Sequence, residues 1–567
     1  MTKIALKNGE KALQKKRYVD AIVAFESVLK SSPKNVSAHV GLASCYAQLN
    51  KWLEALNAIL NALGYGNYQQ KELVLFIKIL DACQLNSYVE PIESALKVAI
   101  KSKWLEGSAA IHLTNQLFIK YHKTLSHPVT CISEEIESMY RDESLHIIIE
   151  RKTTSSFPLE QILLLGRKEM LRCAVNNQDI SHYVPFVAAL ACQNLLNHNL
   201  YHTSDEELTL LNQLNENKNS LLKVLMQLCY VDFQGAIEIW QENKILIIDS
   251  NLTSLIDDLT LYEKVIDAAN KKINSIQITD HTSQTVQSFY AENPYPKFKS
   301  INVSTITIND MRLQLGQKTL AAPNALIAGC GTGLQALEMA FSNPTALITA
   351  IDLSPTSLAY GELKAEQLGL TNIQFKLLDI LEVDSLEQTF DFIMCTGVLH
   401  HMNSPQAGLN ALSSVLKSDG SMIIGLYSKL ARKELKEMQS DAISYLNMGV
   451  EQITKKDVIL WRANLTEEQK AKVRYQRHDC FNINGIMDCL FHPQQAEFSP
   501  IEIQALLDRA KMTFNQMAVS GFCRVTYQKE MQSFPPPNGV ETLAYWHEFE
   551  IQNPDFFKGM INFFITQ

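Results

Sequence analysis

One stretch of residues constrains the fold more than any other, because it joins a short apolar run, a glycine-rich turn and a helical segment. The run at 325–328 (ALIA) has the composition of a buried strand, and the turn at 329–333 (GCGTG) leads into LQALEMAF at 334–341. Such a turn places the backbone N–H groups of a helix N-terminus beside a ligand. Further apolar runs alternate with helical stretches as far as residue 428, which predicts an α/β fold whose mostly parallel sheet is covered by helices.

The spacing of the glycines distinguishes between two kinds of ligand that such a turn can bind. A dinucleotide-binding turn reads G-x-G-x-x-G, and its third glycine would stand where this sequence has Leu334. The compact pattern of Gly329, Gly331 and Gly333 resembles motif I of class I S-adenosylmethionine-dependent methyltransferases instead. The resemblance implies a Rossmann-like domain with a mostly parallel seven-stranded sheet, in which Ala328 and the three glycines hold the methionine part of S-adenosyl-L-methionine.

Three later strand ends agree with this resemblance. Asp352 ends the run LITAID, where a carboxylate can accept hydrogen bonds from both hydroxyls of a ribose, and Leu353 follows it. The alternative for Asp352 is that it caps the next helix. Asp379 ends the next run and resembles the residue of this superfamily that faces the adenine amino group, with Ile380 beside the ring. Thr396 ends the run FDFIMCT and resembles motif IV, which lies closest to the methyl group.

Four side chains are candidates for catalysis. His400 and His401 follow the strand that ends at Thr396 and could act as acid or base, or they could be structural. Tyr290 and Tyr295 stand shortly before the glycine-rich turn, in a segment that two prolines make stiff. This segment either folds over the cofactor pocket as a lid, with both tyrosines in the pocket, or packs as a linker.

The region before the α/β part is helical and begins with a repeat. Ala21 recurs as Ala55, and Tyr18 recurs as Trp52, with a period of 34 residues that resembles the tetratricopeptide repeat. Amphipathic helices then follow one another without a strand pattern. The predicted domains are tetratricopeptide repeats at 1–68, an all-helical region at 69–275, a class I methyltransferase core at 276–428, an insertion after the fifth strand at 429–499, and the end of the core with a C-terminal helix at 500–567.

The insertion at 429–499 is expected to be helical and to cap the substrate, because ligands bind at that edge of an open α/β sheet. Asp479, Asp488 and His492 fall in it. Their spacing does not suit metal ligands on one helix, so a role in the substrate pocket or in capping is favoured, and no metal is predicted. The 11 cysteines form no C-x-x-C pair, which favours free thiols in a reducing cytoplasm over zinc ligands.

Charge and hydropathy exclude two classes of partner. The formal net charge is −9 and no basic stripe stands out, so nucleic acid is not an expected partner. No apolar run approaches the roughly 20 residues that span a bilayer, and the first residues are charged, unlike a signal peptide. A cytoplasmic protein without membrane insertion is expected.

Nearly the whole chain resembles bacterial proteins that fuse tetratricopeptide repeats to a class I methyltransferase, and it is distantly similar to bacterial protein-lysine methyltransferases. Segments 189–208, 479–498 and 546–560 carry the resemblance outside the motifs. The motifs indicate methyl transfer, and the repeats, which build surfaces that bind peptides, favour a protein side-chain nitrogen as the acceptor, lysine above others, with the repeats holding the protein substrate. One alternative is a small-molecule methyltransferase whose helical region forms a homodimer or closes the site. The other is a scaffold that binds the cofactor without turnover.

Overall fold

The structure of the chain is a computed structural model. It describes residues 2–66, 69–83, 85–101, 105–127, 129, 131–215, 220–250, 252–272, 280–292, 294–301, 306–475, 479–518, 534–554, 556–557 and 559–567. The domain boundaries expected at residues 68 and 275 lie outside the described residues. Among the residues described, no helix combines the length and apolarity needed to cross a bilayer.

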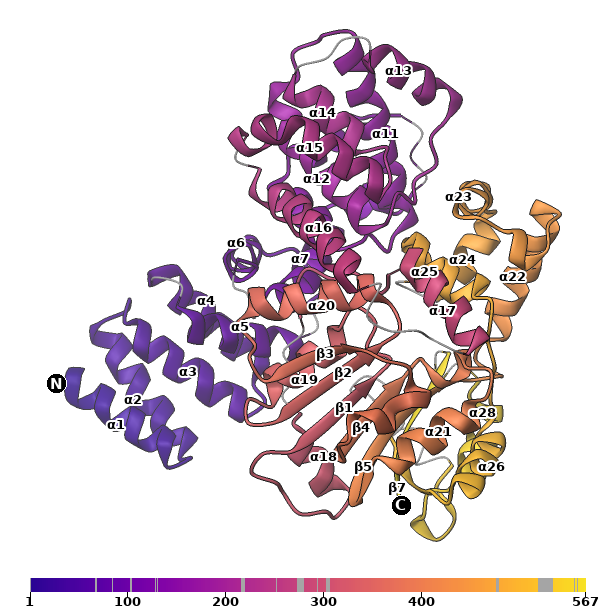
Figure 1. Cartoon of the computed structure of the whole chain (residues 1–567). Helices are drawn as coiled ribbons and strands as arrows, with labels where there is room; N and C mark the ends of the chain where they lie inside the picture. Colours follow the sequence, from indigo (N-terminus) through magenta and orange to yellow (C-terminus); the bar gives the residue numbers. More distant parts are fainter. Residues whose placement is uncertain are drawn as a thin grey trace.

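The helical part of the chain precedes the sheet and forms two groups of helices (Figure 1). The repeat helices are α1 (Thr2–Gln14), α2 (Tyr18–Ser31), α3 (Val36–Gln48) and α4 (Trp52–Tyr65). The helices after them are α5 (Gln70–Ala82), α6 (Glu90–Ala99), α7 (Glu106–Lys120), α8 (His122–Leu125), α9 (Glu134–Tyr140), α10 (Glu143–Arg151), α11 (Phe157–Val175), α12 (Val184–Leu196), α13 (Asp205–Asn215), α14 (Leu221–Leu228), α15 (Phe233–Asp249) and α16 (Thr253–Lys272).

The α/β part carries the sheet, its covering helices and the insertion. Its strands are β1 (Asn324–Ala328), β2 (Leu347–Asp352), β3 (Ile373–Leu377), β4 (Phe390–Thr396), β5 (Leu416–Tyr427), β6 (Thr513–Met517) and β7 (Met560–Thr566). Its helices are α17 (His281–Glu292), α18 (Ile308–Gln314), α19 (Leu334–Ser342), α20 (Pro355–Leu368), α21 (Pro405–Ser414), α26 (Pro500–Ala510) and α28 (Leu543–Gln552). The insertion between β5 and α26 contains α22 (Lys433–Leu446), α23 (Lys455–Ala463), α24 (Glu467–Tyr475) and α25 (Ile483–Phe491).

Small residues let the repeat helices approach one another closely. Ala21 and Ala55 are completely buried. A Cβ added to Gly9 or Gly41 would lie 2.6 or 2.4 Å from the ring of Phe25, so both glycines make room for this one side chain. Small residues at these positions therefore allow the repeat helices to pack closely around Phe25.

The sheet confirms the predicted fold class. The described strands form one seven-stranded sheet in the order β3-β2-β1-β4-β5-β7-β6, in which only β7 runs antiparallel to its neighbours. The central strand β1 is apolar on both faces: Leu326 and Ala328 belong to one apolar cluster, whereas Ala325 and Ile327 belong to another. Alternate side chains of a strand point to opposite faces, so a strand covered by helices on both sides reads as a continuous apolar run.

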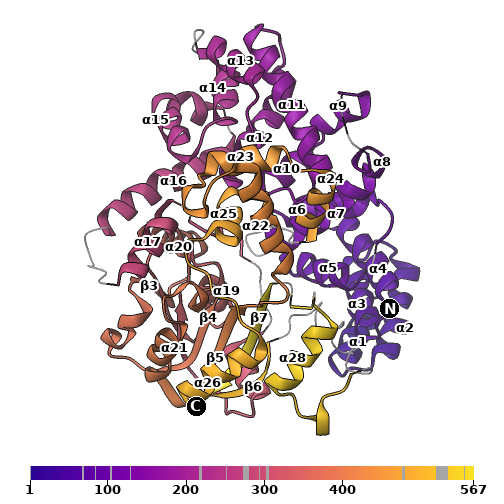
Figure 2. The same cartoon turned by 90° about the vertical axis from the view of Figure 1, so that its right-hand side faces the viewer.

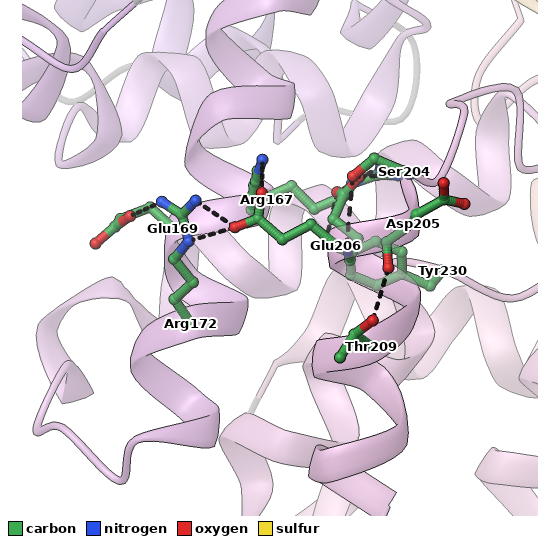
Figure 3. Close-up of polar contacts among 10 residues, drawn as sticks. Arg167, Glu169, Arg172, Ser204, Asp205, Glu206, Thr209 and Tyr230 are labelled. Carbon is green, nitrogen blue, oxygen red and sulfur yellow. Dashed lines mark hydrogen bonds and ion pairs between the residues drawn. The ribbon is translucent and has the colours of Figure 1, made fainter.

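A buried ion pair joins α11 to α13, and Figure 3 shows the polar residues around its arginine, Arg167. Arg167 of α11 donates to Glu207 of α13 at 2.9 and 3.2 Å, and its guanidinium lies 4.2 Å from the ring centre of Tyr230. The Glu207 carboxylate also accepts hydrogen bonds from the backbone N–H and the hydroxyl of Ser204 at 2.9 and 2.8 Å. Ser204 directly precedes α13, and the buried carboxylate that accepts from it also fixes α11 against α13.

The helical region and the α/β part share one apolar core. A single cluster extends from Ala12 in the repeats through Val265 of α16 to Ala359 of α20, and α16 packs against α20. The insertion contacts the helical region as well (Figure 2). Arg462 of α23 pairs with Glu160 of α11 through two hydrogen bonds of 2.6 and 2.8 Å. The helices around the sheet are therefore held in place by packing and by a buried ion pair.

Candidate functional site

The strand ends open into one cavity. Its volume is about 300 Å³, within the range of small-molecule sites. Most of the residues that the sequence singled out line it, namely Tyr290, Tyr295, Gly329, Gly331, Asp352, Leu353, Asp379, Ile380, Thr396 and His401. Ala328, Gly333 and His400 do not line it.

The glycine-rich turn has the backbone that its sequence requires. Gly329 and Gly331 have φ angles of +68° and +52°, a conformation that side chains with a Cβ rarely adopt. A Cβ on Gly331 would lie 2.6 Å from the carbonyl oxygen of Tyr295, and one on Gly329 would lie 2.4 Å from Val398. The segment that contains Tyr295 can therefore pack against the turn only because Gly331 has no side chain.

Asp352 sits at the end of β2, beside this turn. Its carboxylate accepts a hydrogen bond of 2.7 Å from the backbone N–H of Gly331 and one of 2.8 Å from that of Ser354. Burial raises the pKa of Asp352, and these backbone hydrogen bonds oppose the increase. The residue that caps α20 is Ser354, whose hydroxyl accepts from the backbone N–H of Ser357, so the capping alternative for Asp352 does not describe this structure.

The next two strand ends complete the same wall of the cavity. The Asp379 carboxylate accepts from the backbone N–H of Leu381 at 2.9 Å, and Ile380 is buried beside it. At the end of β4 the Thr396 hydroxyl donates to the side chain of Gln335 at 2.8 Å. Two acidic side chains on neighbouring strands and an apolar surface between them fit an adenosine.

The segment before the turn covers the cavity. The Tyr295 hydroxyl donates to Asp479, and the Tyr290 hydroxyl donates to Asp488 at 2.5 Å. The hydroxyl of Thr332 in the glycine-rich turn donates to the carbonyl of Pro296. Burial raises the pKa of both tyrosines, so their hydroxyls stay protonated at neutral pH. The segment packs on the turn and also lines the cavity, so it combines features of the two alternatives, lid and linker.

The two histidines after β4 occupy different positions. His400 is completely buried, accepts from the backbone N–H of Tyr427 at 3.3 Å and stacks on that ring at 3.6 Å between ring centres. His401 lines the cavity and hydrogen-bonds through Nδ1 to the carbonyl of Gln494 at 2.8 Å. Burial lowers the pKa of His401 to about 4, and it also lowers the pKa of His400 well below its ordinary value. His400 therefore supports the ring of Tyr427, and only His401 faces a ligand.

His401, Asp488 and His492 form a group whose ligand atoms lie within 4.8 Å of one another, as metal ligands do. Two observations speak against an ion. Nδ1 of His492 accepts from the backbone N–H of Gln494 at 3.1 Å, so the proton of the neutral ring is on Nε2, which then has no lone pair for a metal. The rings of His401 and His492 lie 3.8 Å apart at an interplanar angle of 33°, so their in-plane lone pairs do not converge.

Two residues that line the cavity were not predicted from the sequence. Tyr427 at the end of β5 and Met560 at the start of β7 both line the cavity. Tyr427 could have been found, because it ends the fifth strand at the same sheet edge as Asp352 and Thr396. Met560 carries no local signal, because its strand inserts beside β5 from the far end of the chain.

Comparison with known proteins identifies the two recognisable parts of the chain. Residues 324–485 match a family model described as a methyltransferase domain, and residues 12–66 match one described as a tetratricopeptide repeat. An uncharacterized protein of a Synechococcus strain is 32% identical over 207 residues, which is 34% of this chain and 48% of the relative. The ubiquinone biosynthesis O-methyltransferase of Coxiella burnetii is 30% identical over 139 residues, 24% of this chain and 56% of the relative.

Among solved structures, PKMT2 of Rickettsia typhi in complex with AdoHcy is 14% identical and covers 48% of this chain and 55% of its own, with a TM-score of 0.37. The chain spans about half the length of the curated relatives it matches. The sequence and the sheet therefore define a class I methyltransferase domain preceded by a tetratricopeptide repeat.

Proposed function

We propose that the chain transfers a methyl group from S-adenosyl-L-methionine to a side-chain nitrogen of a protein, with lysine as the favoured acceptor. One observation carries the proposal: a single cavity joins the glycine-rich turn and Asp352 to a polar end formed by Tyr290, Tyr427 and Asp488. The first end suits the methionine and ribose parts of the cofactor, and the second suits a nitrogen that arrives with a positive charge.

The residues of the chain would align the reactants and exclude water. Bound S-adenosyl-L-methionine supplies a methyl group already activated by the positive charge on sulfur. Asp352 would hold the ribose, and Asp379 with Ile380 would hold the adenine, which fixes the methyl group near the end of β4. Holding two reactants in line makes the reaction effectively intramolecular, and a closed cavity removes competing water.

The repeats support a protein acceptor. Stacked helical repeats build surfaces that bind peptides and partner proteins, and this repeat shares its apolar core with the helices that cover the sheet. The relative from Coxiella burnetii, whose name gives a role in ubiquinone biosynthesis, favours a small molecule as the second candidate for the acceptor.

A transfer assay distinguishes these acceptors. Cofactor with a tritiated methyl group is incubated with the full chain and a lysate of the source cells, and protein is then separated from small molecules. We expect label in protein, and acid hydrolysis should release it as methylated lysine. Label in the small-molecule fraction alone would contradict the protein acceptor. Tight cofactor binding without transfer to either fraction would favour a scaffold that binds cofactor without turnover.

A further inference from the structure

A buried carboxylate faces the acceptor end of the cavity. Asp488 of α25 is only 9% exposed, and its exposed surface is part of the cavity lining. Tyr290 of α17 donates to it at 2.5 Å, and Tyr427 of β5 lies close enough to lower its pKa. The carboxylate is thus oriented by side chains from two elements that the chain brings together from positions far apart in sequence.

The charge of Asp488 is not balanced within the protein. Among the described residues it forms no ion pair, and the nearby cation, Arg432, lies over the ring of Tyr427 at 3.7 Å. Arg432 is already engaged by Glu497 at 3.4 Å and by the carbonyl of Cys489 at 2.6 Å. A buried carboxylate without a cationic partner is costly, so a cation that enters the cavity gains strongly by pairing with it.

The neighbouring histidines do not supply this cation. Burial lowers the pKa of His401 to about 4 and that of His492 to about 2, so both rings are neutral at neutral pH. Nε2 of each ring is buried without a hydrogen-bond partner. The acceptor end therefore combines one negative charge with neutral polar groups, an arrangement that selects a positively charged nitrogen over a hydroxyl or a carboxylate.

We propose that Asp488 binds the ammonium group of the acceptor and then takes one of its protons. The inference rests on the proposed function and adds the catalytic base to it. A proton moves from the acceptor nitrogen to a carboxylate oxygen of Asp488. The freed lone pair forms the nitrogen–carbon bond to the methyl group while the carbon–sulfur bond breaks, and that bonding pair stays on sulfur. The products are a methylated ammonium, S-adenosylhomocysteine and protonated Asp488, which returns its proton to water when the product leaves.

Burial favours this role. It raises the pKa of Asp488, while the hydrogen bond from Tyr290, the charge of Arg432 and the neighbouring Tyr427 oppose the increase. A carboxylate with a raised pKa is a stronger proton acceptor than one in water. The same cationic chemistry could come from the cofactor itself, whose methionine part carries an ammonium group. The two sources are separated by measuring cofactor affinity together with transfer.

The test compares Asp488→Asn with the wild type and with Asp441→Asn, which removes an exposed carboxylate from α22 of the same insertion. Poly-L-lysine is the acceptor probe, tritium transfer gives kcat/KM, calorimetry gives the Kd of S-adenosyl-L-methionine, and elemental analysis gives bound zinc. For Asp488→Asn we expect kcat/KM to fall on the order of 100-fold, the scale of a lost general base, with the cofactor Kd unchanged. For Asp441→Asn we expect both quantities to stay at the wild-type value.

Each other outcome overturns the inference in a different way. Equal transfer by Asp488→Asn and wild type would leave the proposed function standing and remove Asp488 from it. A cofactor Kd raised in parallel with the loss of transfer would assign Asp488 to the cofactor or to the fold. One zinc per chain that disappears in Asp488→Asn would make the group a metal site. A wild type that binds cofactor but transfers nothing to poly-L-lysine would contradict the amine acceptor and hence the proposed function itself.

Discussion

Adding one methyl group to the glycine-rich turn tests whether the turn and the tyrosine segment fit together as the structure has them. The substitution is Gly331→Ala, in which the new Cβ lies 2.6 Å from the carbonyl oxygen of Tyr295. Gly316→Ala is its matched control, because Gly316 also has a positive φ, +71°, but a Cβ there meets nothing within 4 Å. The two variants share the cost of the backbone conformation, and only the first has the collision.

The expected magnitudes follow from these two contributions. Alanine in the left-handed region costs about 1–2 kcal/mol, which is the whole cost for Gly316→Ala. A contact of 2.6 Å with a backbone atom forces the chain to move, and overpacking of this kind costs about 1–3 kcal/mol more. Gly331→Ala should therefore destabilise the methyltransferase domain by about 2–5 kcal/mol. It should also weaken cofactor binding about tenfold or more, since Tyr295 and Asp352 both contact this turn.

Urea unfolding followed by circular dichroism measures the loss of stability, and calorimetric titration with S-adenosyl-L-methionine measures the affinity. The informative quantity is the difference between Gly331→Ala and Gly316→Ala in each assay. If the two variants unfold at the same urea concentration and bind cofactor equally well, the close approach of Tyr295 to the turn does not exist in solution. The explanation of the glycine at this position would then be wrong.

Two other predictions concern the cavity. Asp352→Ala should weaken cofactor binding by about 2–3 kcal/mol, the scale of charge-assisted hydrogen bonds, and near-wild-type affinity by calorimetry would refute the ribose assignment. Acidification should destabilise the protein through His401, whose pKa is lowered from 6.5 to about 4 on folding. The unfolded chain binds the proton between these values, so stability is lost as pH falls, by about 2 kcal/mol at pH 5. His401→Asn, which keeps a donor for the carbonyl of Gln494, should lose less stability between pH 7 and pH 5 than the wild type, and equal losses in urea unfolding would contradict this origin.

The sequence by itself determined the order of the elements and the end of the cavity beside the glycine-rich turn. Gly329, Gly331 and Asp352 could be predicted because parallel strands end at one sheet edge, so residues at successive strand ends must lie close together. The tetratricopeptide repeat could be recognised for a similar reason. Small residues such as Ala21 and Ala55 recur where two of its helices pack against each other. Both patterns depend on residues that are close together in the sequence. The geometry of a strand, a turn or a pair of helices is therefore enough to predict them.

Only the tertiary structure decided which residues surround Asp488 at the other end of the cavity. His400 and His401 are adjacent and chemically identical in the sequence, yet one packs under Tyr427 and the other lines the cavity, because the backbone after β4 turns between them. Asp488 reaches Tyr290 across 198 positions of sequence. The insertion that carries it is placed by its packing against the helical region. Contacts between residues so far apart in the sequence depend on how whole helices pack. The spacing of residues along the chain does not predict that packing.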